Sequence, residues 1–125
     1  MEIRRAIPVV TTDQPAQTRA FYEDFFGFRV AMDEDGMLML ASRSTPTTQV
    51  IVAWKSPTAV DPELADVDVS IEVAEVDAAY ARAQAEGLEI VRALRDEPWG
   101  IRRFFVRDPS GRTINVASHV AGPVP

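Results

Sequence analysis

The sequence predicts an α+β protein of two tandem βαβββ modules, whose strands form a curled mixed sheet around a cleft. Segments rich in β-branched residues alternate with two segments of helical periodicity. Turn residues recur at a nearly constant offset: Gly27 and Gly87 lie 60 positions apart, and Pro46 and Pro109 lie 63 apart. One helix covers only one face of a four-stranded sheet, so the two sheets should curl together or pair with another subunit.

The first module is expected over about residues 1–56. Strands are predicted at residues 3–11, 28–32, 37–41 and 49–54. A helix over residues 16–26 is expected, with Thr12 or Asp13 as its cap and Gly27 at its end. Its apolar residues at helical spacing include Phe21 and Phe25, which predicts that they face the sheet.

The second module is expected over about residues 66–120 and follows a proline-containing connector at 57–65. Strands are predicted at 67–73, 88–94, 101–107 and 112–118, and a helix at 76–86 that Gly87 ends. We treat residues 1–125 as a single domain and expect residues 121–125 to fray.

Composition excludes several classes of protein. The chain is 46% hydrophobic and therefore can bury a core, but its net charge of −6 argues against nucleic acid as a partner. The absence of cysteine removes disulfides and thiolate metal sites. No apolar run reaches the length of a membrane helix, and none near the start suits a signal peptide, so we expect a cytoplasmic protein without a membrane partner.

Three motifs resemble those of the vicinal oxygen chelate superfamily, which contains glyoxalase I, extradiol dioxygenases and bleomycin-resistance proteins. Residues 20–28 read AFYEDFFGF and resemble the family's helix-end signature. Residues 98–100 and 108–111 read PWG and DPSG, as at the end of single-domain members, and residues 6–12 read AIPVVTT, as at the start of bleomycin-resistance proteins. The resemblance covers nearly the whole chain and implies a concave pocket, usually in a homodimer.

Enzymes of that superfamily bind a divalent metal through His, Gln or Glu side chains on four strands. By resemblance, the corresponding positions here are Ala6 or Arg5, about Val52, Asp68 and Asn115. Alanine and valine offer no donor atom, and a neutral amide oxygen is a weak ligand. The resemblance therefore implies that the metal site is lost, so we expect no metal and no cofactor.

Two tryptophans are candidates for the wall of a ligand pocket. Trp99 lies between a proline and a glycine in a loop, where it either stacks on a flat ligand or packs against the protein. Trp54 ends a strand and could also stack on a ligand, with packing against the protein or a dimer interface as the alternative.

Three further side chains are candidates for ligand contacts. Phe28 and Met39 could line an adaptable apolar pocket or simply fill the core. Arg103, on the same side of its strand as Arg107, could clamp an acidic ligand group or face solvent.

The carboxylates of Asp68 and Glu72 are candidates for acid–base catalysis. An even spacing along a strand puts them on one face. If that face lines the cleft with Asn115, the pair could act as acid and base or bind an amine; equally, it could face water. His119, the single histidine, has no partner nearby in the sequence, so we expect it at the surface or at a dimer edge.

These observations favour a metal-free, homodimeric binding protein of the bleomycin-resistance type, hence a role in antibiotic resistance. It would sequester or carry an aromatic, or cationic, small molecule in a cleft between subunits. The alternative is a lyase, isomerase or dioxygenase with an atypical metal set or with acid–base carboxylates. A third hypothesis is a regulatory or structural dimer without a small ligand.

Overall fold

The computed structural model describes residues 1–120 as two compact units, and the tail expected to fray, residues 121–125, lies outside this range. One unit comprises residues 7–68, and the other comprises residues 1–6 with the chain from residue 69 onward. We call them the 7–68 unit and the C-terminal unit. Each contains one βαβββ pattern, which confirms the α+β class and the two modules.

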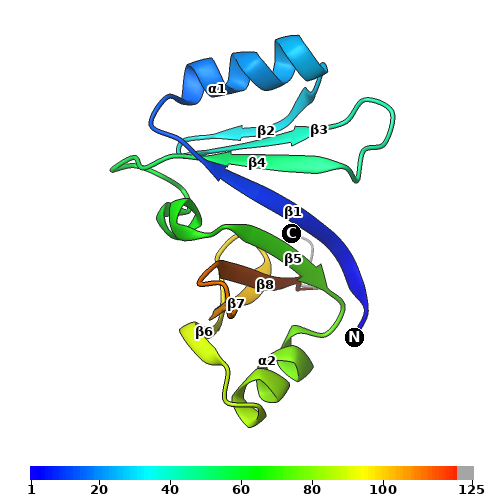
Figure 1. Ribbon diagram of the computed structural model, residues 1–125, viewed down its shortest axis with the longest axis vertical. Helices are drawn as coiled ribbons and strands as arrows, with labels where there is room; N and C mark the ends of the chain where they lie inside the picture. Colours follow the sequence, from blue (N-terminus) through cyan, green and yellow to red (C-terminus); the bar gives the residue numbers. More distant parts are fainter. Residues whose placement is uncertain (121–125) are drawn as a thin grey trace. The chain divides into compact units, whose positions relative to one another are not determined.

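The 7–68 unit has four strands in the order β2-β3-β4-β1 (Figure 1). They are β2 (Arg29–Glu34), β3 (Met37–Ala41), β4 (Gln49–Ala53) and β1 (Ile3–Thr11), of which the part from Ile7 onward belongs to this unit. β1 and β4 run parallel, whereas β2, β3 and β4 are antiparallel neighbours. The helical segments are α1 (Pro15–Phe21), η1 (Tyr22–Phe26) and η2 (Pro62–Asp66), and α1 packs on β4.

The first helix differs from the expectation in form and in the face that it buries. α1 continues into η1, a π-helical turn, and ends where Gly27 adopts a φ of 76°. Phe21 and Phe25 are 53% and 73% exposed, so the prediction that they face the sheet is wrong. Tyr22 and Phe28 instead pack on the apolar cluster of this sheet, which comprises Leu38, Leu40 and Val52.

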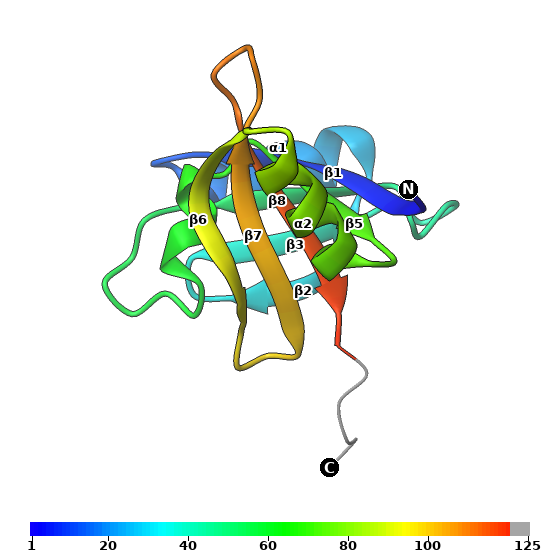
Figure 2. The same ribbon diagram turned by 90° about the horizontal axis from the view of Figure 1, so that it is seen from below.

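The C-terminal unit has strands in the order β5-β8-β7-β6 (Figure 2). Its elements are β5 (Val69–Val73), α2 (Val76–Ala85), β6 (Glu89–Asp96), β7 (Ile101–Arg107) and β8 (Thr113–His119). β5 and β8 are parallel, and β6, β7 and β8 are antiparallel neighbours. α2 packs on β6, β7 and β8.

A single apolar cluster lies beneath α2. Its buried members are Val73, Val76, Ala79, Ala83, Phe104 and Val116. Since strand side chains alternate between faces, the neighbours of Phe104 and Val116 point to the opposite face of the sheet. That opposite face carries the polar residues described below. Within residues 1–120, no helix has the length and apolar character needed to cross a membrane.

Candidate functional site

A row of four side chains crosses the C-terminal sheet on the face opposite α2. Strand register pairs Ser70 with Asn115, Asn115 with Phe105, and Phe105 with Arg92. The next row brings Arg103 beside Ala117. The sheet therefore brings together two arginines, an amide and an aromatic ring from the three strands β6, β7 and β8, although Arg92 and Asn115 are far apart in the sequence.

Arg103 is the centre of this face. Its side chain is only 2% exposed, and its guanidinium lies 5.3 Å from the centroid of the Trp99 ring and 5.0 Å from that of Phe105. Arg92 approaches the same Phe105 ring, also at 5.0 Å. Guanidinium groups over aromatic faces are held by attraction to the ring quadrupole. We call Trp99, Arg103, Phe105 and Arg92 the arginine–aromatic stack.

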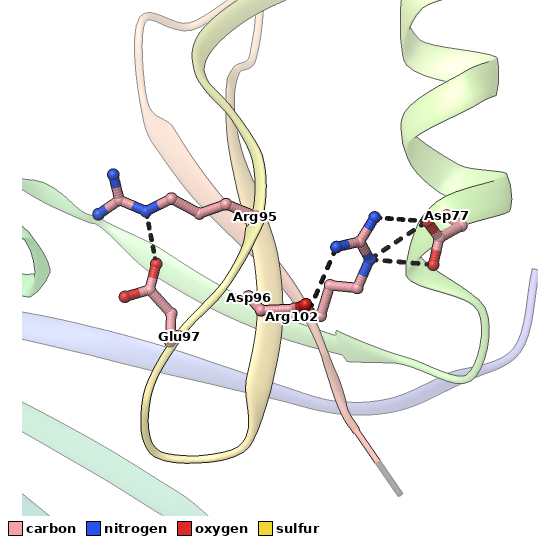
Figure 3. A network of polar contacts seen from close by, with 5 residues as sticks. All are labelled: Asp77, Arg95, Asp96, Glu97 and Arg102. Atoms are coloured by element: carbon pink, nitrogen blue, oxygen red, sulfur yellow. Dashed lines mark hydrogen bonds and ion pairs between the residues drawn. The ribbon is translucent and has the colours of Figure 1, made fainter. Parts of the chain in front are cut away.

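Glu97 is the carboxylate of this region. Its Oε1 accepts a hydrogen bond from Arg92 and one of 2.9 Å from Arg95 Nε (Figure 3), and lies 3.7 Å from Arg103 Nε. Burial favours the neutral acid, but the hydrogen bonds from Arg95 and Arg92 and the charge of Arg103 outweigh it, so the pKa of Glu97 lies below its usual value. The carboxylate is therefore ionised at neutral pH.

Arg102 points to the other side of β7 from Arg103 and has a structural role. It donates to the Asp77 carboxylate at 2.9 Å and to Asp96 at 3.2 Å, which links α2 to the end of β6 (Figure 3). The Asp77 pKa is lowered chiefly by the hydrogen bond from Arg102. Adjacent arginines of one strand thus serve opposite faces.

Asn115 has one satisfied and one unsatisfied polar atom. Its Nδ2 donates to Ser70 Oγ at 3.0 Å. Its Oδ1 is buried and, among the residues that the structure describes, has no hydrogen-bond partner. A buried acceptor without a donor costs about 1–3 kcal/mol. Asn115 can therefore accept a hydrogen bond from a ligand at little further cost.

The two catalytic candidates differ in place and environment: Glu72 lies on β5, whereas Asp68 precedes the first residue of this strand, so the prediction that they share one strand face is wrong. Glu72 Oε2 is 2.7 Å from an Arg5 guanidinium nitrogen and 2.6 Å from His119 Nδ1, whereas Asp68 is exposed. Burial raises the pKa of Glu72, but the Arg5 hydrogen bond and charge and the charge of His119 outweigh it, and the pKa is lowered. Glu72 is thus held as a carboxylate, and His119, expected to lack a nearby partner, contacts it.

The candidates of the 7–68 unit fall in two places. Trp54 and Phe28 pack against the cluster of Leu38, Leu40 and Val52. Met39 alternates with Leu38 along β3 and therefore points to the opposite face. The structure does not bring these three predicted contacts to one surface.

The sequence profile of the Glyoxalase/Bleomycin resistance protein/Dioxygenase superfamily matches residues 6–116. The chain belongs to this superfamily. The family suggested by the three sequence motifs is thereby confirmed. No curated protein has a significant match to the chain.

Three solved structures share the fold of this chain. A glyoxalase/bleomycin resistance protein/dioxygenase superfamily member from Vibrio splendidus is 18% identical, with a TM-score of 0.68 over 93% of this chain and 98% of that one. Methylmalonyl-CoA epimerase from Mycobacterium tuberculosis is 18% identical, with a TM-score of 0.68 over 99% and 89%. A hypothetical protein from Bacillus halodurans is 10% identical and has a TM-score of 0.75 over all of both chains. At these identities the likeness concerns the fold.

The residues at the superfamily's metal positions do not suit a divalent cation. Val52 is fully buried in the apolar cluster, and Ala6 has no donor atom. Asn115 offers one amide oxygen, and Asp68 is a single carboxylate. Within residues 1–120, no group of three or more His, Cys, Asp or Glu side chains could hold a metal ion.

Three residues of this polar face of the C-terminal sheet were not singled out from the sequence: Arg92, Phe105 and Glu97. Phe105 could have been found, because it lies two residues from Arg103 and strand side chains alternate. Arg92 and Glu97 depend on the register of β6 with β7, which shifts at bulges near Ile90 and Arg92. Alternation along one strand does not predict such shifts.

Proposed function

We propose that this superfamily member is a metal-independent binding protein that sequesters or carries an aromatic small molecule. The arginine–aromatic stack beside Asn115 carries the proposal. Trp99 is 40% exposed while its ring contacts Arg103, so one tryptophan is both fixed and available to stack on a flat ligand. Asn115 Oδ1 supplies an acceptor for a ligand donor.

The charges around the stack bear on the kind of ligand. Arg92, Arg95 and Arg103 surround the one carboxylate of Glu97. Guanidinium groups are suited to planar acidic groups, since they donate two parallel hydrogen bonds to a carboxylate. This environment favours an aromatic ligand with an acceptor or acidic substituent over a cationic one.

The lowered pKa values of Glu72 and Glu97 favour a binding role over metal-free acid–base catalysis. A general acid or base works best when its pKa lies near the operating pH. Glu72 and Glu97 both have pKa values lowered by arginine neighbours, which moves them away from that range. An enzymatic lyase or isomerase role would therefore need another group or a bound metal.

A ligand screen with a metal analysis tests the proposal. We expect the purified protein to contain no stoichiometric transition metal and to be stabilised against heat by flat aromatic compounds from a panel that also includes drugs, dicarbonyls and catechols. Trp99→Ala should abolish the stabilisation. Met32→Ala, which removes an exposed apolar side chain from the 7–68 unit, should leave it unchanged.

Two outcomes would contradict the proposal. A stoichiometric transition metal whose removal abolishes ligand binding would show a metal-dependent site. Stabilisation by the same compounds in wild type and Trp99→Ala would show that they bind elsewhere. Stabilisation by drug-like ligands of the bleomycin type would support a role in antibiotic resistance.

The proposal includes a homodimer. Phe21, Phe25 and Phe26 are each more than half exposed and contact one another, so they form an apolar surface patch suited to a subunit interface. Analytical ultracentrifugation should give a dimer mass. A monomer at all concentrations would contradict this part of the proposal.

A further inference from the structure

An open cavity of about 630 Å³ lies within the 7–68 unit, at the ends of β1 and β4 and the start of α1. Cavities of this size are typical of small-molecule sites. It is lined by Thr11, Thr12, Asp13, Pro15, Trp54 and Lys55. None of these residues belongs to the arginine–aromatic stack, so the function of this cavity is a separate question.

Trp54 gives the cavity a rigid apolar wall. Its half-buried side chain packs against the cluster of Leu38, Leu40 and Val52. Its backbone N–H donates to Gly36 O at 3.0 Å, which fixes the chain just after β4. A ring that lines the cavity and is already held by packing loses little entropy when a flat ligand stacks on it.

The rest of the lining is polar and carries both donors and acceptors. Thr11 Oγ1 donates to Ala65 O at 3.2 Å, so its oxygen lone pairs remain able to accept. Asp13 is exposed and contributes carboxylate oxygens. Lys55 contributes an ammonium group that is 3.5 Å from Asp66 and 78% exposed, and an ammonium has three donor protons.

The two charged lining residues have opposite signs. A ligand with a net negative charge would meet the Asp13 carboxylate, and a cationic ligand would meet the Lys55 ammonium. A neutral ring with several hydroxyl groups can donate to Asp13 and accept from Lys55 while its apolar face lies on Trp54. Sugar rings combine such a face with such a rim.

We propose that this cavity binds a neutral saccharide, stacked on Trp54 and held at its hydroxyls by Asp13 and Lys55. The proposal is independent of the aromatic-ligand function assigned to the C-terminal unit. Its openness suits a ligand that keeps part of its hydroxyl rim in water, because exposed hydroxyls then need no protein partner.

The two tryptophans provide an experiment with an internal control. The indole N–H groups of Trp54 and Trp99 give two signals in a ¹H–¹⁵N NMR spectrum, which Trp99→Phe assigns. We expect N-acetylglucosamine, maltose or cellobiose at millimolar concentration to move the Trp54 signal in a saturable way and to leave that of Trp99 in place. Benzoate should not move the Trp54 signal.

Two matched aspartate variants locate the site. Asp13→Ala removes an exposed lining carboxylate and should weaken the saccharide affinity by about tenfold, the effect of losing a hydrogen bond to a charged group. Asp24→Ala removes an exposed carboxylate of the same unit that does not line the cavity, and should leave the affinity unchanged. Both substitutions are at exposed positions, so both variants should fold.

The outcomes separate this proposal from the function proposed above. A Trp54 signal that no saccharide moves, or that moves equally in Asp13→Ala and wild type, overturns the saccharide site. A Trp54 signal that benzoate moves and saccharides do not overturns the ligand class. Changes at Trp99 alone would concern the arginine–aromatic stack and would also overturn a saccharide site at Trp54.

Discussion

The two units share one βαβββ topology but differ in what they bury. Within residues 1–120, every buried polar or charged side chain belongs to the C-terminal unit: Glu97, Arg103, Thr113, Asn115 and Ser118. In the 7–68 unit the buried side chains are apolar, such as those of Leu40, Val52 and Ala53. Burying polar groups costs free energy unless partners compensate. The difference indicates that apolar packing holds the 7–68 sheet, whereas the C-terminal sheet also holds buried polar groups that need partners.

The helices of the two units also differ in how many of their side chains are buried. α2 buries Val76, Ala79 and Ala83 against its sheet, whereas α1 and η1 have no buried residue. The C-terminal unit therefore owes more of its stability to the helix–sheet contact. In the first helix only the Tyr22 ring packs on the apolar cluster, whereas Phe21, Phe25 and Phe26 are exposed.

The largest expected difference in stability is between the loss of a phenylalanine from the C-terminal unit and the loss of one from the 7–68 unit. Phe104 is 2% exposed at the centre of the cluster under α2, so Phe104→Ala should lower the free energy of unfolding by about 4 kcal/mol. Phe25 is largely exposed in the single chain, so at concentrations at which the protein is monomeric Phe25→Ala should cost less than about 0.5 kcal/mol. Urea denaturation followed by circular dichroism measures both. Equal losses of stability in the two variants would mean that η1, which contains Phe25, packs on its sheet as α2 does.

Arg103 and Arg102 are neighbours on β7, and they allow the stability effect of a buried arginine to be compared with that of a more exposed one. Arg103→Ala should cost about 3 kcal/mol, because it leaves a gap between Trp99 and Phe105 and removes a charge near the buried Glu97. Arg102→Ala should cost much less, because its ion pairs lie at the surface. The same urea titration compares the two variants. Similar midpoints would show that the stack does not stabilise the fold.

The repeated pattern of strands and helices was predictable because turn chemistry and strand alternation are local signals. Gly27 ends the first helix at a positive φ, and β1, β3 and β7 have the bounds expected from their apolar periodicity. The exposed Phe21 was not predictable in the same way. Periodicity shows that a helix has an apolar side, but not whether the sheet beneath has room for it.

The candidate site was predicted in part for a related reason. Trp99 was singled out from its loop motif, Arg103 from strand alternation and Asn115 from the family resemblance, and in the structure Trp99 contacts Arg103. Glu97 was missed because it follows β6 in the chain, where it meets Arg92 and Arg95 of β6 and approaches Arg103 across the hairpin with β7. Which side chains meet across a hairpin depends on register, and bulges shift it.

Acid should weaken the C-terminal unit through the buried carboxylate of Glu97 and the half-buried one of Glu72. The pKa values of Glu97 and Glu72 are lowered in the folded state, so the unfolded chain binds more protons between those values and the usual glutamate pKa of about 4.3. Their stabilisation is complete above that usual pKa and is lost as the pH falls through the lowered values. We therefore expect the thermal unfolding midpoint of the wild-type protein to decrease as the pH is lowered through this range.

The variant Glu97→Gln should show a shallower acid fall, because it removes one of the groups that must be protonated, and a lower midpoint at neutral pH. Glu34→Gln, at an exposed position of the 7–68 unit, should follow the wild-type curve. Thermal unfolding monitored by circular dichroism from neutral pH into the acid range gives all three curves. If Glu34→Gln reduced the decrease of the thermal unfolding midpoint in acid as much as Glu97→Gln does, the acid sensitivity would not arise from the polar face of the C-terminal unit. The two units would then differ in their buried residues but not in their response to acid.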